Sequence, residues 1–412
     1  MQTDFDILIV GGGLVGASLA CALRGGPLAV GVVEAVAPAV ADRPGYDDRT
    51  LALAYGSRRI LEGMGVWAAV AARGAAPIKR IHISDRGRFG FTRLHAEDAG
   101  LEALGYVVAA PVLGAALYEA LRGATNISLI CPATVEAVAT DDRAAQARVR
   151  MDGAEHTLTA RLIVAADGTD SPIRAAAGIA AQRVDYGQSA IVSAVTPSRA
   201  HAWTAYERFT DSGPLALLPA GAEHCAVVWT VAADRVETML GWDDETFRVR
   251  LQECFGERLG RLEGLGRRRA YPLSLIRVRE HVRPRLALIG NAAHSVHPVA
   301  GQGFNLGLRD AAALSEVLLE GAAAGADIDA IDRLRRYAAW RERDNRMTAT
   351  LTHSLVRVFS NDYLPVACAR NFGLIAVDLL PPLKRGLIRG TSGLAGRLPR
   401  LARGLPARGS RS

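Results

Sequence analysis

The sequence predicts an α/β fold: a mostly parallel sheet, an inserted antiparallel sheet and C-terminal helices. Apolar runs without alternation are typical of strands buried on both faces, and they occur at 7–10, 28–33, 162–166 and 286–289. The stretches 76–99 and 181–270 alternate more between apolar and polar residues, as half-buried antiparallel strands do. From about 307 to 378 the apolar spacing is helical, and Pro381 and Pro382 end this pattern.

The parallel sheet begins with a βαβ unit. Residues 7–10 form its first predicted strand, 17–23 its helix and 28–33 its second strand, which runs into Glu34. The runs at 162–166 and 286–289 each end in a turn of small residues and precede a predicted helix. We therefore expect separated segments of the chain to build one sheet, with the antiparallel stretches inserted between them.

Composition and charge restrict the possible partners. Half of the residues are hydrophobic and 22% are charged, which is a globular composition. Aromatic residues make up only 6%, too few for a surface that stacks nucleic-acid bases, so we expect no nucleic-acid partner. The net charge of +7 arises in the tail, because no acidic residue follows Asp378. This basic segment is either a solvated terminus or a contact for an anionic membrane surface.

Cysteine usage and the N-terminus bear on localisation. The five cysteines lie far apart without a Cys-x-x-Cys pair, which fits a reducing compartment and excludes a zinc ribbon or a disulfide framework. Asp4 and Asp6 stand where a secretion signal would be basic. The uncharged apolar stretch 103–118 contains Pro111 and is too short to cross a bilayer. We expect a cytoplasmic protein, at most peripheral on the inner face of the bacterial cytoplasmic membrane.

The first motif follows the first predicted strand. Residues 11–16 read Gly-Gly-Gly-Leu-Val-Gly, a G-x-G-x-x-G pattern that opens a helix. Gly11 permits a tight turn, Gly13 lets the backbone approach a pyrophosphate, and Gly16 lets the helix pack close to the sheet. The first helical turn offers N–H groups and a partial positive charge to phosphates. Glu34, at the end of the next strand, could accept hydrogen bonds from ribose, so the sequence predicts a Rossmann-like site for a nicotinamide dinucleotide or FAD.

Two later segments favour FAD. Residues 167–174 read Asp-Gly-Thr-Asp-Ser-Pro-Ile-Arg after a buried strand. Residues 290–298 lead through a small-residue turn into Gly-Gln-Gly-Phe-Asn-Leu-Gly at 301–307. A glycine-flanked helix start presents backbone N–H groups to an anion, and reduced flavin carries negative charge at N1 and O2.

The three motifs resemble the fingerprints of the class A FAD-dependent aromatic hydroxylases, which share the para-hydroxybenzoate hydroxylase-like fold. These fingerprints are G-x-G-x-x-G, D-G-x-x-S-x-x-R and G-D-A-A-H-x-x-x-P-x-x-G-Q-G-x-N, and the similarity extends to about residue 378. Within the family the chain is most similar to the ubiquinone-biosynthesis branch, in particular to the 2-octaprenyl-6-methoxyphenol hydroxylases. Asn291 departs from the usual Asp of the third fingerprint but keeps hydrogen-bonding capacity.

The resemblance implies a domain organisation and a reaction. The FAD-binding domain would comprise 1–75, 100–180 and 271–330, the substrate domain 76–99 and 181–270, the C-terminal helices 331–380 and the basic tail 381–412. NAD(P)H would visit transiently and reduce FAD, since the chain has no second G-x-G-x-x-G. O2 would then add at flavin C4a, and the hydroperoxide would hydroxylate a polyprenylated phenol.

The resemblance also implies site residues. The ADP half of FAD would be held by Gly11, Gly13, Gly16 and Glu34. Arg49 would reach the cofactor between its halves, the alternative being a surface salt bridge. Asp167 would meet the ribityl or pyrophosphate side with Arg174 as its ion-pair partner, and Asn291 would support the same region. The isoalloxazine ring, where catalysis occurs, would be framed by Pro298, Gly301, Gly303, Asn305 and Leu306.

Several alternatives stay open. His294 and His297 have a spacing that could bind a metal, but no flanking carboxylate or cysteine completes a site, so we expect packed or hydrogen-bonded histidines and no metal. The protein could instead hydroxylate or reduce a small soluble aromatic compound, or be a non-catalytic FAD-bearing component of a membrane assembly. We also expect an apolar substrate tunnel, lined by the side chains of Trp203, Tyr206, Phe209, Leu215, Leu217, Leu218 and Trp229.

The basic tail can be interpreted in two ways. Its leucines lie between eight basic residues, and several are three or four positions apart. Its glycines argue against one long helix, so we expect short pieces that become ordered on contact with lipid. The alternative is docking to a partner hydroxylase in a complex of quinone-biosynthesis proteins.

Overall fold

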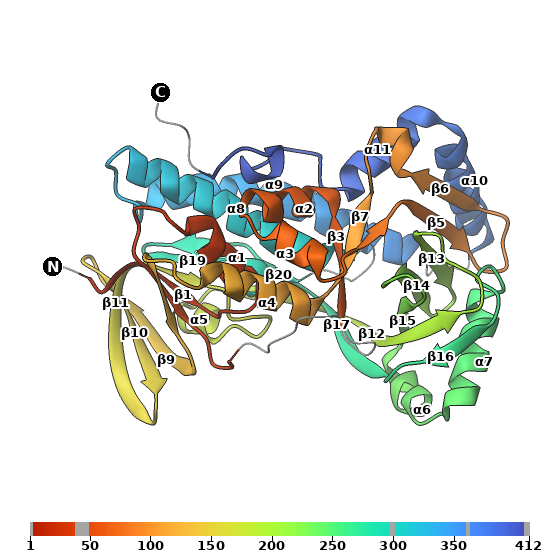
Figure 1. Cartoon of the computed structure of the whole chain (residues 1–412), viewed down its shortest axis with the longest axis horizontal. Helices are drawn as coiled ribbons and strands as arrows, with labels where there is room; N and C mark the ends of the chain where they lie inside the picture. Colours follow the sequence, from red (N-terminus) through yellow and green to blue (C-terminus); the bar gives the residue numbers. More distant parts are fainter. Residues whose placement is uncertain (1–2, 38–48, 296–300, 360–362, 408–412) are drawn as a thin grey trace.

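The computed structural model of the chain describes residues 3–37, 49–295, 301–359 and 363–407. Two bodies lie side by side, one built on a mostly parallel sheet and the other on a mostly antiparallel sheet (Figure 1). This is the predicted α/β fold with an inserted antiparallel sheet and C-terminal helices. His297 and Pro298 lie outside the described residues.

The first sheet has the strand order β18-β19-β11-β1-β2-β8. Its parallel strands are β1 (Phe5–Val10), β2 (Val30–Val33), β8 (Ile127–Ile130), β11 (Ala154–Ala165) and β19 (Leu286–Leu288). The short strand β18 (Val282–Arg283) pairs antiparallel with β19, and the hairpin of β9 (Ala133–Thr140) and β10 (Ala145–Met151) extends from β11. Every apolar run that the sequence predicts as a parallel strand therefore contributes to this sheet.

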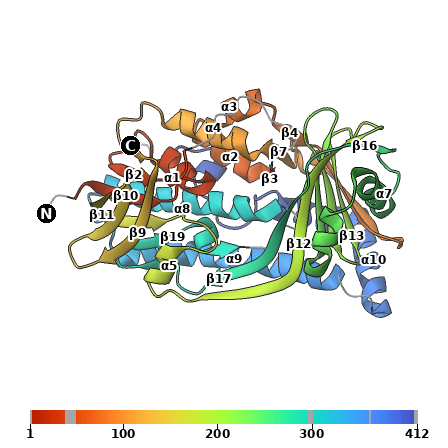
Figure 2. The same cartoon turned by 90° about the horizontal axis from the view of Figure 1, so that it is seen from below.

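Different layers cover the two faces of the parallel sheet (Figure 2). Ile7 and Ile9 pack against α1 (Leu14–Leu23), α4 (Ala110–Leu121) and α8 (Gln302–Ala323). Leu8 and Val10 point to the opposite face and pack against the β9–β10 hairpin and α5 (Pro172–Ala176). Since both faces are covered, polar side chains would be desolvated on either side, which explains the uninterrupted apolar run.

The second sheet has the strand order β20-β17-β12-β15-β14-β13-β5-β6, with β16 beside β12. Its strands are β5 (Arg80–Asp85), β6 (Phe91–His95), β12 (Ala181–Pro197), β13 (Thr204–Thr210), β14 (Gly213–Pro219), β15 (Cys225–Ala232), β16 (Leu262–Leu265), β17 (Arg269–Val278) and β20 (His294–Ser295). β13 and β5 are parallel neighbours. Most of these strands fall within 76–99 and 181–270, but β17 and β20 extend the sheet beyond that range.

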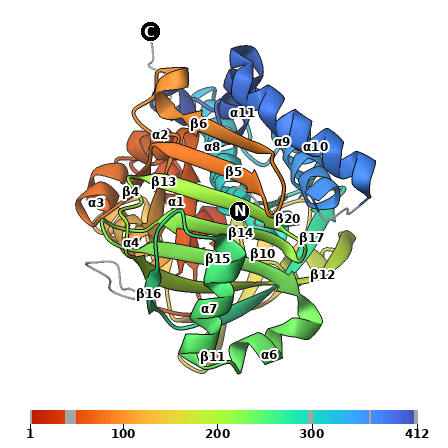
Figure 3. The same ribbon diagram turned by 90° about the vertical axis from the view of Figure 1, so that its right-hand side faces the viewer.

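One face of the second sheet, here called the outer face, is covered by α6 (Val236–Leu240) and α7 (Asp244–Phe255), as Figure 3 shows. The core below α7 contains Leu215, Leu217 and Trp229, with Tyr206 packed against it. These four side chains were expected to line a substrate tunnel, and that expectation is wrong. They point away from the parallel sheet because their strand positions alternate with those of the opposite, inner face.

The remaining elements connect the two bodies. A small sheet of β3 (Thr50–Ala54), β7 (Gly105–Ala109) and β4 (Ala76–Ile78) contacts β14 of the second sheet. The helices α2 (Tyr55–Gly63) and α3 (Trp67–Ala72) follow β3, and α9 (Ile331–Phe359) packs on α8. Phe359 of α9 stacks on Phe209 of β13, with ring centroids 3.6 Å apart. The second sheet is thus held against the first by elements on both sides.

Two prolines separate the last two helices. α10 (Leu364–Leu379) ends before Pro381, as predicted, but Pro381 and Pro382 then open a further helix, α11 (Pro381–Thr391). Proline is well suited to the first helical turn because its missing N–H would have no partner there. The two helix axes are bent by 97° at this break.

The described part of the basic tail is folded onto the body, which corrects the expectation of short pieces that order only on contact. Ile388 and Leu401 are 0% and 2% exposed. The backbone N–H of Gly56 in α2 donates to the carbonyl oxygen of Ser392 at 2.8 Å. The backbone N–H of Arg400 donates to the Glu316 carboxylate of α8 at 2.6 Å. Ile388 packs with Leu94 of β6 in the second sheet, and Leu401 packs in the core of the first body, so the tail contacts both bodies.

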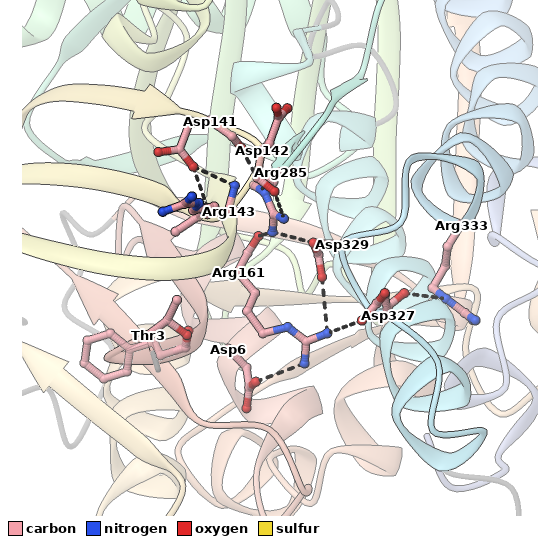
Figure 4. Close-up of polar contacts among 12 residues, drawn as sticks. Thr3, Asp6, Asp141, Asp142, Arg143, Arg161, Arg285, Asp327, Asp329 and Arg333 are labelled. Atoms are coloured by element: carbon pink, nitrogen blue, oxygen red, sulfur yellow. Dashed lines mark hydrogen bonds and ion pairs between the residues drawn. The ribbon is translucent and has the colours of Figure 1, made fainter. Parts of the chain in front are cut away.

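An ion-pair network holds the loop between α8 and α9 to one edge of the parallel sheet (Figure 4). Arg161 of β11 lies 3.4 Å from Asp6, 3.1 Å from Asp327 and 3.2 Å from Asp329. Arg285, next to β19, also pairs with Asp329. The network thus ties together three strands that are far apart in the sequence.

Candidate functional site

The three sequence motifs meet at the carboxyl edge of the parallel sheet. The first motif follows β1, the segment 167–174 follows β11, and the segment 290–295 follows β19. Parallel neighbours end at the same edge, so the sheet places these loops side by side. The side chain of Val15 on α1 would meet a Cβ added at Gly290 and one added at Gly307 of α8, which shows how closely the three motifs pack.

The glycine-rich loop has three different steric environments. Gly11 has φ of +99°, and a Cβ there would lie 2.5 Å from the carbonyl oxygen of Ala166. A Cβ on Gly16 would overlap the carbonyl oxygen of Gly11, so this glycine lets α1 approach the turn. A Cβ on Gly13 would meet no protein atom within 4 Å. Gly13 is the N-cap of α1 and no side chain caps this helix, so the first-turn N–H groups can bind an anion.

Glu34 organises the glycine-rich loop. One carboxylate oxygen accepts a hydrogen bond from the Gly12 N–H at 2.6 Å, and the other accepts one from the Val36 N–H at 2.9 Å. Carboxylate oxygens can each accept more than one hydrogen bond, which leaves capacity for ribose hydroxyls. Tyr118 of α4 donates its hydroxyl to the Gly12 carbonyl at 2.7 Å, and burial, with Glu34 nearby, raises the pKa of Tyr118 to about 12.

Asp167 lies directly after β11. Its Oδ2 accepts a hydrogen bond from the Ile173 N–H at 3.1 Å, while its Oδ1 is buried and has no partner among the residues described. Burial raises the pKa of Asp167, although hydrogen bonds from Ser171 and Ile173 oppose this. An unsatisfied buried carboxylate oxygen is costly, so this atom marks a place where a ligand hydroxyl could donate.

The predicted ion pair between Asp167 and Arg174 is not formed. Arg174 Nη1 instead donates to the carbonyl oxygens of Thr169 at 3.1 Å and Ala292 at 2.9 Å, and no ion pair joins these two described side chains. Arg174 is only 9% exposed. Its guanidinium therefore links the second motif to the third, because carbonyl oxygens of both loops turn toward it.

The third motif is anchored by a buried aspartate that the sequence analysis missed. Asp310 of α8 accepts hydrogen bonds from the Gly290 N–H at 3.1 Å, from His294 at 2.6 Å and from Arg341 Nε at 2.7 Å. Burial disfavours its charged form, yet His294 and Arg341 hold the pKa of Asp310 well below its ordinary value. His294 is thus a buried, hydrogen-bonded histidine, as predicted. The available signal for Asp310 was the adjacent charged pair Arg309 and Asp310 between apolar residues of the predicted helix.

Asn291, next in the third motif, is exposed. Its side-chain amide donates to the Thr169 hydroxyl at 3.4 Å, so it lies beside the second motif at the same edge. The amide contact spans two loops that would both border a cofactor.

The start of α8 is fixed by Asn305. The Asn305 side chain accepts from the Ala54 N–H at 2.8 Å and donates to the carbonyl oxygens of Ala52 at 2.9 Å and Gly301 at 2.7 Å. Its hydrogen-bonding groups are used within the protein, so it positions the helix start against β3. Gly301 has φ of +61° and forms the N-cap, and Leu306 is 0% exposed.

Among the described glycines of the third motif, Gly303 is the one where an added Cβ would meet no atom within 4 Å. Contact between the backbone of this segment and the cofactor stays a prediction. Arg49 lies at the border of the two bodies, since its guanidinium carbon is 5.4 Å from the ring centroid of Tyr271 in β17. This places it near both sheets, where a contact with the cofactor stays a prediction.

Together these features fit a bound FAD. The uncapped α1 start and the open space at Gly13 suit a pyrophosphate, Glu34 suits a ribose, and the unpartnered Asp167 oxygen suits a hydroxyl donor. The uncapped start of α8 offers N–H groups at the same edge. The site is therefore that of a dinucleotide-binding flavoprotein.

Comparison with known proteins identifies the family. The family described as FAD binding domain matches residues 4–346. The chain is 40% identical over 405 residues to the ubiquinone hydroxylase UbiL of Rhodospirillum rubrum, covering 97% of this chain and 93% of that protein. It is 33% identical over 391 residues to the 3-demethoxyubiquinol 3-hydroxylase of Escherichia coli, covering 94% and 98%. The chain belongs to the family of FAD-dependent monooxygenases that includes the ubiquinone hydroxylases.

Solved structures agree on the fold. The p-nitrophenol 4-monooxygenase PnpA of Pseudomonas putida superposes with a TM-score of 0.76 at 19% identity, covering 96% of this chain and 100% of that one. PqsL of Pseudomonas aeruginosa, in complex with 2-aminobenzoylacetate, gives a TM-score of 0.75 at 25% identity, covering 90% and 99%.

Proposed function

We propose that this enzyme hydroxylates the aromatic ring of a polyprenylated phenol in ubiquinone biosynthesis, with NAD(P)H as electron donor and O2 as the source of oxygen. The observation that supports this most directly is the relationship, over 97% of the chain, to a protein named a ubiquinone hydroxylase. The resemblance of the motifs to the 2-octaprenyl-6-methoxyphenol hydroxylases points to the same substrate class.

The residues of this chain hold and shield the cofactor. The loop 11–13 and the start of α1 bind the pyrophosphate, and Glu34 binds the ribose of the ADP half. Asp167 accepts a hydrogen bond from the ribityl side, and the start of α8 faces the ring system with backbone N–H groups. FAD, when bound, supplies the activated oxygen. The inner face of the second sheet holds the phenol and excludes water from it.

Turnover of the purified holoenzyme tests the proposal. With a 2-prenylated phenol, NAD(P)H and isotopically labelled O2, we expect phenol-dependent NAD(P)H consumption and a product that contains one labelled oxygen atom. The same assay with phenol lacking the prenyl group separates a lipid substrate from a small soluble one. Consumption of NAD(P)H without a labelled hydroxyl product would contradict the proposal.

The substrate class requires a route to the bilayer, and we propose that the corner between α10 and α11 docks on an anionic membrane. No helix among the described residues can span a membrane alone. Large apolar side chains nevertheless point to solvent along α10 and at this corner: Tyr363 (68% exposed) and Leu364 (65%) lie at the start of α10, Phe372 (65%) in its middle and Leu379 (70%) at the corner. The basic side chains of Arg385 and Arg389 on α11 are also exposed and complement anionic headgroups.

Point substitutions test this surface better than truncation, because the tail beyond Leu380 includes buried residues. The double variant Phe372→Ser with Leu379→Ser should sediment less than wild type with phosphatidylglycerol vesicles, while its FAD content stays unchanged. Leu129→Ser is a matched control, since Leu129 is 42% exposed on β8 in the other body. Equal sedimentation of the double variant and wild type would rule out this docking surface.

A further inference from the structure

Strand β13 presents an isolated carboxylate on the inner face of the second sheet. Side chains two positions apart share one face of a strand, so Ala205, Glu207 and Phe209 point together. Ala205 belongs to a cluster with Ile78 of β4 and Val107 of β7, in the small sheet that joins the two bodies. The face that carries Glu207 is therefore turned toward the FAD-binding body.

A row of partly exposed side chains crosses the sheet at Glu207. Glu207 pairs with Ala216 of β14, Ala216 pairs with Val228 of β15, and Val228 pairs with Val192 of β12. Glu207, Val228 and Val192 each keep solvent-accessible surface, and Ala216 is the smallest possible chiral side chain.

The positions on either side of this row are closed. The residues two positions before and after each member on the same face are buried on β12, β13 and β15: Ala190, Ala194, Ala205, Phe209, Ala226 and Thr230. Glu207, Val228 and Val192 therefore mark a strip of the inner face, here called the inner strip, that neighbouring side chains leave partly uncovered, with Ala216 (8% exposed) between Glu207 and Val228.

Glu207 has no hydrogen-bond or ion-pair partner on the inner strip. It makes no hydrogen bond or ion pair with any described residue, and burial alone raises its pKa to about 7. The side chains aligned with Glu207 across this face are apolar, from Ile83 of β5, Ala216 of β14, Val228 of β15 and Val192 of β12, and Phe359 of α9 lies across the interface. The nearest charged pair on this face is Asp85 of β5, which lies beside Phe209 and forms a buried ion pair with Arg370 of α10. The charged residue aligned with the row is Arg269 of β17, beside Val192 at its far end.

We propose that Glu207 binds the hydroxyl group of the phenol substrate and accepts its proton during hydroxylation. A row of apolar side chains with one unpaired carboxylate matches a ring with an alkyl substituent and a single donor group. The phenolic O–H bond breaks, the proton moves to a Glu207 oxygen, and the electron pair stays on the phenol oxygen. A phenolate ring is more electron-rich, so an electrophilic oxygen donor attacks it more readily. This inference rests on the proposed function for the identity of the substrate.

The proton transfer is chemically reasonable at neutral pH. A phenol ionises near pH 10 and an ordinary glutamate near pH 4.3. A general base is most efficient when its pKa lies near the operating pH. The elevated pKa of Glu207 makes the difference between its pKa and that of the phenol smaller. The carboxylate nevertheless stays ionised above neutrality.

The test compares Glu207→Gln with wild type, using holoenzyme and 2-prenylphenol carrying one isoprene unit. Glu263→Gln is the matched control, because Glu263 is an exposed glutamate on β16 of the same sheet. We expect the rate of wild type to rise with pH through about 7. The Gln variant should lose this dependence and roughly 10²-fold or more of kcat, with unchanged FAD content. A fluorinated, more acidic 2-prenylphenol should restore part of its activity.

Binding provides a second measurement. The methyl ether of 2-prenylphenol has no hydroxyl proton, so it should perturb the flavin absorbance of wild type only at higher concentration than the phenol does. With Glu207→Gln, the concentrations of phenol and ether that perturb the flavin absorbance should be closer to each other. Unchanged kcat and pH profile in Glu207→Gln, or equal binding of phenol and ether by wild type, would overturn the role of Glu207. If wild type hydroxylates neither compound, the proposed function fails, while the two binding constants still decide the role of Glu207.

Discussion

Replacing Glu207 by glutamine should stabilise the fold in a pH-dependent manner. Burial raises the pKa of Glu207 from 4.5 to about 7 in the folded protein. Each pKa unit corresponds to about 1.36 kcal/mol, so keeping Glu207 ionised costs the folded state about 3 kcal/mol above neutrality. Below pH 4.5 the side chain is protonated in both the folded and unfolded states, and this cost disappears. The cost therefore appears as the pH rises from 4.5 to 7.

Urea unfolding with FAD in fixed excess measures this effect. The free energy of unfolding of Glu207→Gln minus that of wild type should increase by about 3 kcal/mol between pH 4.5 and pH 8. Any effect of the glutamine amide itself is independent of pH, so it changes the free-energy difference at pH 4.5 and at pH 8 by the same amount. Glu263→Gln should show no such increase. A difference that stays constant across this range would refute the argument that protein surrounds an unpaired carboxylate at this position.

Three further predictions concern the FAD-binding edge. Gly13→Val should lose FAD without lowering the melting temperature of the apoprotein. Gly16→Ala should instead destabilise the protein itself by roughly 1–3 kcal/mol through overpacking. Flavin absorbance and thermal melting distinguish the two variants. Asp167→Ala should weaken FAD binding in a fluorescence titration, and unaltered affinity with unaltered melting would refute its role. Asp310→Asn should lower the free energy of unfolding by about 3–5 kcal/mol, because Arg341 would lose a buried counter-charge; a urea titration showing no loss would contradict this.

The sequence predicted the parts of the fold that depend on local pattern. Buried parallel strands need continuous apolar runs, so β1, β2, β11 and β19 were all visible before the structure. The glycine spacing reports steric demands within one turn, which is why Gly11 and Gly16 have the close contacts that the motif implies.

Features that depend on distant partners could not be predicted. Alternation along β13 and β14 shows that two faces differ, but not which face α7 covers, so the apolar side chains beneath α7 were assigned to the wrong side. Arg174 was paired with Asp167, the carboxylate at the start of the same motif, whereas its partners include the carbonyl of Ala292, 118 residues away. The position of Glu207 could not be predicted either, since only the register of its neighbouring strands shows which side chains lie beside it on the inner face.

The strands of the parallel sheet come from segments far apart in the sequence, which affects the order in which the fold can form during translation. The network of Arg161 and Arg285 ties β11 to a loop at Asp327 and Asp329, and the helix start at Gly56 is completed by Ser392. At roughly 5–20 residues per second, a ribosome needs about 15–60 seconds after β1 has been made before β19 has been translated. During that interval apolar strand edges have no partner, which is the state that chaperones bind. The loops that form the FAD site follow β1, β11 and β19, so the site is complete only after β19 and the start of α8 have been translated.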